Sequence, residues 1–155
     1  MTNTEIKQSL ETIVNIFQDS IKGYQKAADN VDNTEIKTLF LKISKERKQA
    51  IADLEQDARD FGITLEADGT LKGYFHRVWM DISTTFATKE ALNVVEESMF
   101  GEQEALSVYN EVLDPKNKVH LPAYIRKRLL NQRLDILYSY AKLAALEATL
   151  DKDER

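Results

Sequence analysis

The feature that most constrains this chain is an apolar repeat that alternates steps of four and three residues along four long stretches. In the first stretch, from about Thr4 to Val31, the repeat contains Ile6, Leu10, Ile13, Phe17, Ser20, Tyr24, Ala27 and Val31. Such a repeat places its members on one face of an α-helix, where they can pack against neighbouring helices. Glycine (5 residues) and proline (2 residues) are too scarce to interrupt long helices often. The sequence therefore predicts an all-α fold without β-sheet.

The same repeat predicts three further long helices. The second is expected from the Asp32-Asn33 turn to about Phe61, where Asp32 and Glu35 have capping spacing and Gly62 suits the position after the helix. Its repeat contains Ile36, Phe40, Ile43, Arg47, Ala50, Leu54, Asp57 and Phe61. The third, from about Lys89 to Leu113, has the repeat Leu92, Val95, Met99, Glu102, Leu106, Tyr109 and Leu113. The fourth, from Pro122 at its first position to about Leu150, has the repeat Ile125, Leu129, Gln132, Ile136, Ser139, Leu143, Leu146 and Leu150.

The connections between these helices indicate how they are arranged. Short turns join the first helix to the second and the third to the fourth, so each pair should be antiparallel neighbours. Between the pairs, a shorter amphipathic helix over about 70–86 would cover roughly 24 Å at ~1.5 Å per residue, most of the length of a bundle. A long crossover between two helical hairpins is typical of ferritin-like bundles. We therefore predict one domain over residues 1–155, a ferritin-like antiparallel four-helix bundle whose long crossover contains a short extra helix; a five-helix globule is the alternative.

Four segments resemble a bacterial family of ferritin-like bundles of unassigned function. The run DSIKGYQKAADN, from Asp19 to Asn30, resembles its first helix, and LFLKISKERKQAIADL, which ends at Leu54, resembles its second. The stretch GYFHRVWMDI resembles the family's crossover, and EESMFGEQEAL, with Gly101-Glu102, resembles its third helix. The resemblance extends over nearly the whole chain. It implies a ferritin-like fold and implies no activity.

Composition and charge exclude several classes of function. The net charge of −5 should repel the phosphates of nucleic acids. No cysteine is present, so thiolate metal sites and cysteine nucleophiles are excluded. No run approaches the ~20 apolar residues of a membrane span, and the first residues lack the apolar core of a signal peptide. We expect a cytoplasmic protein with no nucleic-acid or membrane partner; a homodimer fits the sequence, and the physiological partner is not specified.

The motif of a classical di-iron site is missing. Such a site uses a Glu on each of two helices and Glu-x-x-His on each of the other two. Here the second helix offers Glu46-x-x-Gln49 and the fourth offers Asp135-x-x-Tyr138. The only histidines of the chain lie in the crossover and in a loop, at His76 and His120. We therefore predict no metal, no cofactor and no catalytic residue.

An all-oxygen metal site is the alternative that the sequence leaves open. Hard cations accept carboxylate and amide oxygens, and the residues that could provide them are Glu46, Gln49, Glu102 and Asp135. Iron or another divalent cation would then be the cofactor of a degenerate, oxidase-like protein. A third hypothesis is a carrier that holds a small apolar ligand between the crossover helix and the bundle. The leading hypothesis is a non-enzymatic bundle with a stress-related or interaction role.

A buried polar layer is expected near the middle of the bundle. Glu102 lies on the apolar repeat of the third helix, where an unpartnered charge would be costly. If the second and third helices are parallel, Arg47 and Glu102 lie about 15 Å from the same end of the bundle. Ser20 and Ser139 fall near the same height and could add hydrogen bonds. We therefore predict a buried ion pair between Arg47 and Glu102, with the guanidinium in the space of a lost metal.

Overall fold

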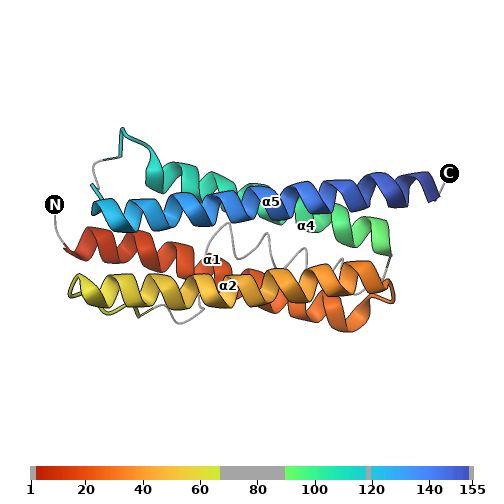
Figure 1. Cartoon of the computed structure of the whole chain (residues 1–155), viewed down its shortest axis with the longest axis horizontal. Coiled ribbons are helices and arrows are strands. Elements are labelled where there is room, and N and C mark those ends of the chain that lie inside the picture. Colours follow the sequence, from red (N-terminus) through yellow and green to blue (C-terminus); the bar gives the residue numbers. More distant parts are fainter. Residues whose placement is uncertain (1–2, 67–89, 118–119, 154–155) are drawn as a thin grey trace.

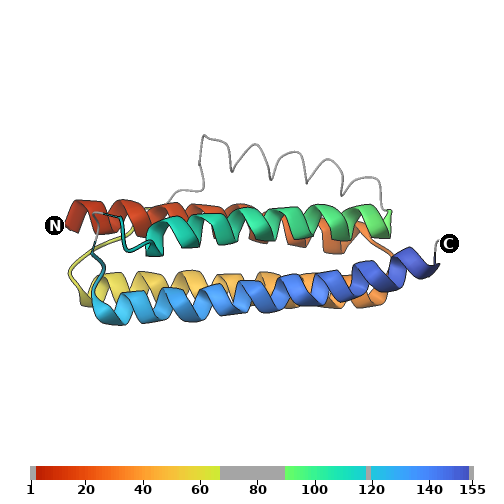
Figure 2. The same cartoon turned by 90° about the horizontal axis from the view of Figure 1, so that it is seen from above.

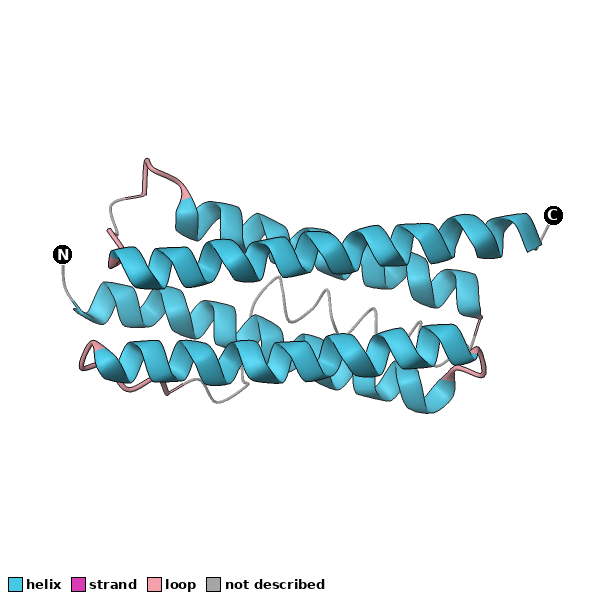
Figure 3. Cartoon of the chain, in the orientation of Figure 1, coloured by secondary structure: helices cyan, strands magenta, loops and turns pink. Residues whose placement is uncertain are grey.

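Four long α-helices form most of the part of the chain that the structure describes. The structure is a computed structural model that describes residues 3–66, 90–117 and 120–153. The helices are α1 (Asn3–Asn30), α2 (Thr34–Asp60), α4 (Ala91–Leu113) and α5 (Ala123–Asp153). Within these ranges no residue belongs to a β-strand (Figure 3). The prediction of an all-α fold with four long helices is confirmed for the described residues.

Several helix ends differ by a residue or more from those expected. The N-cap of α2 is Asn33 rather than Asp32, because Asn33 has an extended backbone and its side chain accepts a hydrogen bond from the Ile36 N–H at 3.1 Å. Pro122 precedes α5 instead of opening it, and its carbonyl accepts the first helical bond, from Arg126, at 2.9 Å. Helix α4 begins at Ala91 and α5 continues to Asp153.

The four helices pack as two antiparallel hairpins. Helix α1 packs along α2, and α4 packs along α5; the hairpins then meet through α1 against α4 and α2 against α5. The helices α2 and α4 are therefore diagonal to each other, and Figures 1 and 2 show that both begin at the same end of the bundle. Two parallel helices on one diagonal can place side chains of equal height opposite each other. The crossover helix expected over 70–86 lies outside the described residues.

The repeats lie mostly in the core between these helices. All eight residues of the first repeat are buried, from Ile6 in α1 to Val31 directly after it. The prediction for Phe61 was wrong: its side chain is exposed, because α2 ends at Asp60 and the positive φ of Gly62 (81°) turns the chain so that Ile63 is buried instead. In α4 the buried face is broader than the predicted repeat and includes Val94, Ser98 and Ala105, since α4 packs against both α1 and α5.

A partly buried polar contact also connects the two hairpins. The Arg128 guanidinium of α5 donates to the Asp57 carboxylate of α2 through Nε at 2.8 Å. The hydroxyl of Tyr124 donates to the Asp57 backbone carbonyl at 3.1 Å. These contacts fix the end of α2 against the beginning of α5. None of the described helices combines the length and the apolar character needed to cross a membrane.

Candidate functional site

The most unusual feature of the core is an ion pair across the diagonal of the bundle. Arg47 Nη2, from α2, donates to Glu102 Oε2, from α4, at 2.7 Å. The exposed fraction is 3% for Arg47 and 0% for Glu102. Burying either charge alone would be strongly unfavourable, so each group makes the other tolerable in the core. The structure thus brings together the two charged members of the expected polar layer.

A tyrosine completes the coordination of the carboxylate. The hydroxyl of Tyr24, from α1, donates to Glu102 Oε1, so both carboxylate oxygens accept a hydrogen bond. Burial raises the pKa of Tyr24 well above its ordinary value, and the neighbouring carboxylate adds to this rise. Burial is the largest influence and would lower the pKa of Arg47, but Glu102, Tyr24 and Tyr109 together outweigh it and the pKa is raised. The hydroxyl therefore stays protonated and the guanidinium stays charged.

Aromatic rings surround the ion pair. The Arg47 guanidinium carbon lies 5.2 Å from the centre of the Phe17 ring, within the range of a cation–π contact. Phe17 packs against Tyr109 with ring centres 5.8 Å apart, and Tyr24 packs against Phe40 at 5.0 Å. These rings exclude water from the pair and strengthen the attraction between its charges.

Not every polar atom near the pair has a partner. Arg47 Nη1 and the hydroxyl oxygen of Ser44, one turn earlier on α2, are buried without a hydrogen bond in the described part of the chain. An unsatisfied buried donor costs about 1–3 kcal/mol. The cation–π contact with Phe17 offsets part of this cost for Arg47. The site therefore holds its charge balance at some expense of stability.

A second polar chain links α4, α5 and α2. The hydroxyl of Tyr109 donates to Gln132 Oε1 at 2.8 Å, and Gln132 Nε2 donates to the Ala50 carbonyl at 3.2 Å. Burial is the main cause that raises the pKa of Tyr109 well above its ordinary value. Both repeat tyrosines thus pack in the core and bond their hydroxyls.

The two serines expected in the layer are buried but do not join the ion pair. The Ser20 hydroxyl donates to the Phe17 carbonyl of its own helix at 3.1 Å. Ser139 is buried, and within the described residues it forms no hydrogen bond with Arg47 or Glu102. A serine side chain is short and commonly bonds a carbonyl in the preceding turn. The longer Tyr24 reaches the carboxylate instead.

The four residues of the alternative metal site are not grouped. Glu46 is exposed beside Lys42 at 4.0 Å, and Gln49 donates to Asp53 at 3.0 Å on the same exposed face. Asp135 is exposed as well, whereas Glu102 is fully buried. Among the described residues, no three His, Cys, Asp or Glu side chains gather as metal ligands would. The donors present do not fit a di-metal centre, since the oxygens of Glu102 already bind Arg47 and Tyr24.

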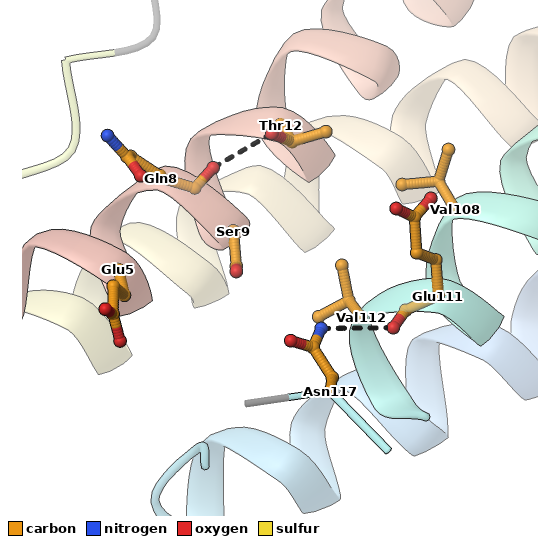
Figure 4. Close-up of a pocket in the computed structure, with 8 residues that line it drawn as sticks. All are labelled: Glu5, Gln8, Ser9, Thr12, Val108, Glu111, Val112 and Asn117. Carbon is orange, nitrogen blue, oxygen red and sulfur yellow. Dashed lines mark hydrogen bonds between the residues drawn. The ribbon is translucent and has the colours of Figure 1, made fainter. Parts of the chain in front are cut away.

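The remaining expected sites give no further cluster. His120 is exposed in the loop before α5, and His76 lies outside the described residues. A groove of about 270 Å³ lies between α1 and α4 (Figure 4). Two of its polar side chains bond their own segments: Thr12 donates to the Gln8 carbonyl at 2.9 Å and Asn117 to the Glu111 carbonyl at 3.2 Å. Its polar groups therefore do not converge on a common point as those of an active site would.

The fold and the site together define a class of protein: a four-helix bundle with a neutralised ion pair at its centre. The family model described as a domain of unknown function, DUF2383, matches residues 5–115. This is well over half of the chain, and the chain belongs to that family. The comparison with curated proteins found no match. The matched residues include Tyr24, Arg47 and Glu102, whereas α5 lies beyond them.

Sequence reasoning missed two members of the site, Tyr24 and Phe17. A signal for Tyr24 was present, because a tyrosine on a buried helix face normally needs a partner for its hydroxyl. Glu102 has two carboxylate oxygens, and Arg47 occupies only one of them. The cation–π role of Phe17 had no comparable signal, since a phenylalanine at that position is explained by packing alone.

Proposed function

We propose that residues 1–155 form one ferritin-like bundle that acts without catalysis, by binding other protein surfaces. In this proposal the guanidinium of Arg47 provides the positive charge that a metal ion provided in an ancestral centre. The single observation that supports this most directly is the buried 2.7 Å contact between Arg47 and Glu102. The parallel, diagonal arrangement of α2 and α4 is compatible with the ferritin-like topology. The stress-related role expected from the sequence stays a prediction.

The electrostatics of the pair argue against a metal at this carboxylate. A divalent cation bound to Glu102 would lie only a few ångströms from the guanidinium. At ~4 Å and an effective dielectric constant of ~20, two unit charges repel by about 4 kcal/mol, and a divalent ion doubles this. One guanidinium already neutralises one carboxylate, so no charge is left to attract a metal. Full burial also prevents Glu102 from exchanging protons with a substrate at the surface.

The test is an aerobic iron-oxidation assay combined with a binding titration. Ferrous iron added to the protein should oxidise no faster than in buffer, and calorimetry with Mn²⁺ should show no saturable binding. Glu102→Gln keeps the shape of the side chain and provides the control. A rate clearly above buffer that disappears in Glu102→Gln and Glu102→Ala, with both variants still helical, would show that the site binds and oxidises metal.

A further inference from the structure

Helix α5 has a second apolar face, which points away from the core. Its bulky members are exposed: Leu130 by 43%, Leu134 by 60%, Leu137 by 37% and Tyr138 by 65%. Exposed alanines continue the same line towards the C-terminus, at Ala141, Ala145 and Ala148. At 100° per residue this line lies opposite the buried residues of α5, such as Leu129, Ile136 and Leu143. An exposed apolar stripe of several turns is typical of an interaction surface.

The order of large and small residues on this face suits a second copy in the opposite direction. In an antiparallel pair centred between Leu137 and Tyr138, residues at equal steps on either side of the centre face each other. Leu134 of one copy then faces Ala141 of the other, and Leu130 faces Ala145. Leu137 faces Tyr138 at the centre, and on either side of it a large residue meets a small one, which allows close packing. A parallel pair would put leucine against leucine at one end and leave a gap between alanines at the other.

The charges beside the apolar line favour the same arrangement. Asp135 and Lys142 flank the apolar line in the same direction around the helix, with Asp135 before the centre and Lys142 after it. In the antiparallel pair, the Asp135 carboxylate of one copy would therefore approach the Lys142 ammonium of the other. Lys42 of α2 lies next to Lys142 and lowers its pKa, an effect that Glu46 partly offsets. The Lys142 ammonium lies 4.9 Å from the centre of the Tyr138 ring, which places it beside the proposed contact. The order of large and small residues and the pairing of Asp135 with Lys142 therefore both fit the antiparallel orientation.

We infer that this face of α5 binds a second copy of the chain, antiparallel about a two-fold axis between Leu137 and Tyr138. A two-fold contact uses the same patch on both copies, as this self-complementary face requires.

From Leu130 to Ala148 the line is about 27 Å long, so with a helix width of ~10–12 Å each copy would bury roughly 300 Å². Stable interfaces bury about 800 Å² per partner. The dimer is therefore weak and forms only at high protein concentration. This inference deepens the proposed interaction role but does not depend on the absence of metal chemistry.

The experiment uses charge reversal and sedimentation equilibrium over a concentration series. Asp135→Lys places two lysines together at each charged contact, and Lys142→Asp places two aspartates there. Each variant alone should associate about tenfold or more weakly than the parent chain. An equimolar mixture of the two variants should associate again, because each contact then joins opposite charges. Leu41→Glu, an exposed leucine of α2 outside this face, is the matched control and should associate like the parent.

Three results would overturn the inference. The parent chain could remain monomeric at the highest concentration reached, which would leave the face to a partner of another kind. The two charge variants could associate as strongly as the parent, which would place the contact elsewhere. Their mixture could fail to associate although each is folded by circular dichroism, which would exclude the antiparallel orientation. None of these results would bear on iron oxidation, so the two proposals can fail separately.

Discussion

The centre of the bundle and the outer face of α5 both depart from the rule that charged side chains lie in solvent and large apolar side chains lie in the core. At the centre, the charged residues Arg47 and Glu102 lie among apolar side chains; on α5, Leu134 and Tyr138 lie in solvent. At the centre each charge has its partner within the chain. On α5 the apolar residues have no such partner among the helices described, and the face is self-complementary. At the centre, the buried charges are balanced by contacts inside the fold. On α5, we propose that the exposed apolar residues are covered by a second copy of the chain.

The largest expected effect comes from breaking the central pair. Arg47→Met or Glu102→Leu should each lower the free energy of unfolding by about 3–5 kcal/mol, because the remaining charge stays buried without its partner. The double variant should lose much less. Urea denaturation followed by circular dichroism measures all four proteins as a double-mutant cycle. Lys7→Met and Glu66→Leu form the control cycle, at an exposed ion pair of 2.9 Å, and should change stability little. Additive losses at the central pair would contradict the account.

The second effect is a loss of stability at high pH. The pKa of Tyr24 is raised in the folded chain, whereas an unfolded tyrosine titrates near 10. Above that pH the unfolded chain releases a proton that the folded chain keeps, so stability is complete below pH ~10 and falls as the pH rises. The fall can reach about 1.4 kcal/mol per pH unit for this group.

Tyr24→Phe should flatten this alkaline decline, measured as the urea midpoint at a series of pH values. The matched control is Tyr138→Phe, which removes the hydroxyl of an exposed ring. That variant should keep the slope of the parent. Equal slopes in Tyr24→Phe and the parent would show that the buried hydroxyl does not contribute to the decline.

A smaller effect is expected from the partly buried contact between the hairpins. Asp57→Asn weakens the contact with Arg128, whose side chain is 40% exposed, so the loss should be about 1 kcal/mol and should shrink at high salt. Asp53→Asn is the control, because Asp53 lies 3.7 Å from the same guanidinium, beyond hydrogen-bonding distance. Thermal unfolding at low and high salt compares them. A loss independent of salt would mean that the contact acts by packing rather than by charge.

The smallest effect tests the outer face itself. Leu134→Gln should change the stability of the dilute, monomeric chain by less than about 0.5 kcal/mol, because the leucine contacts mainly solvent. Urea denaturation at low protein concentration measures this. Leu129→Gln is the matched control on the buried side of α5 and should be strongly destabilising. A large loss in Leu134→Gln would mean that the residue supports the fold and is not reserved for an interface.

Much of the fold could be predicted because helix periodicity is local. The repeat of α1 identified its buried face, and the third repeat was expected to end at Leu113, where α4 ends. Errors appeared where the chain leaves a helix. Phe61 continued the repeat of α2 in sequence, but the turn at Gly62 removed it from the core. The breadth of the buried face of α4 depends on which helices flank it, and the periodicity of one helix carries no information about its neighbours.

The site divides in the same way. The sequence alone determined that Arg47 and Glu102 lie on apolar faces, and the count of residues from their helix starts placed them at equal heights, since the rise per residue of an α-helix is fixed. Only the tertiary structure decided which side chains complete the site. Tyr24 binds the carboxylate and Phe17 lies against the guanidinium, whereas the serines at similar heights do not reach the pair. The reason is physical: helix geometry sets position along the axis, but contact across the core depends on side-chain length and on how neighbouring helices pack.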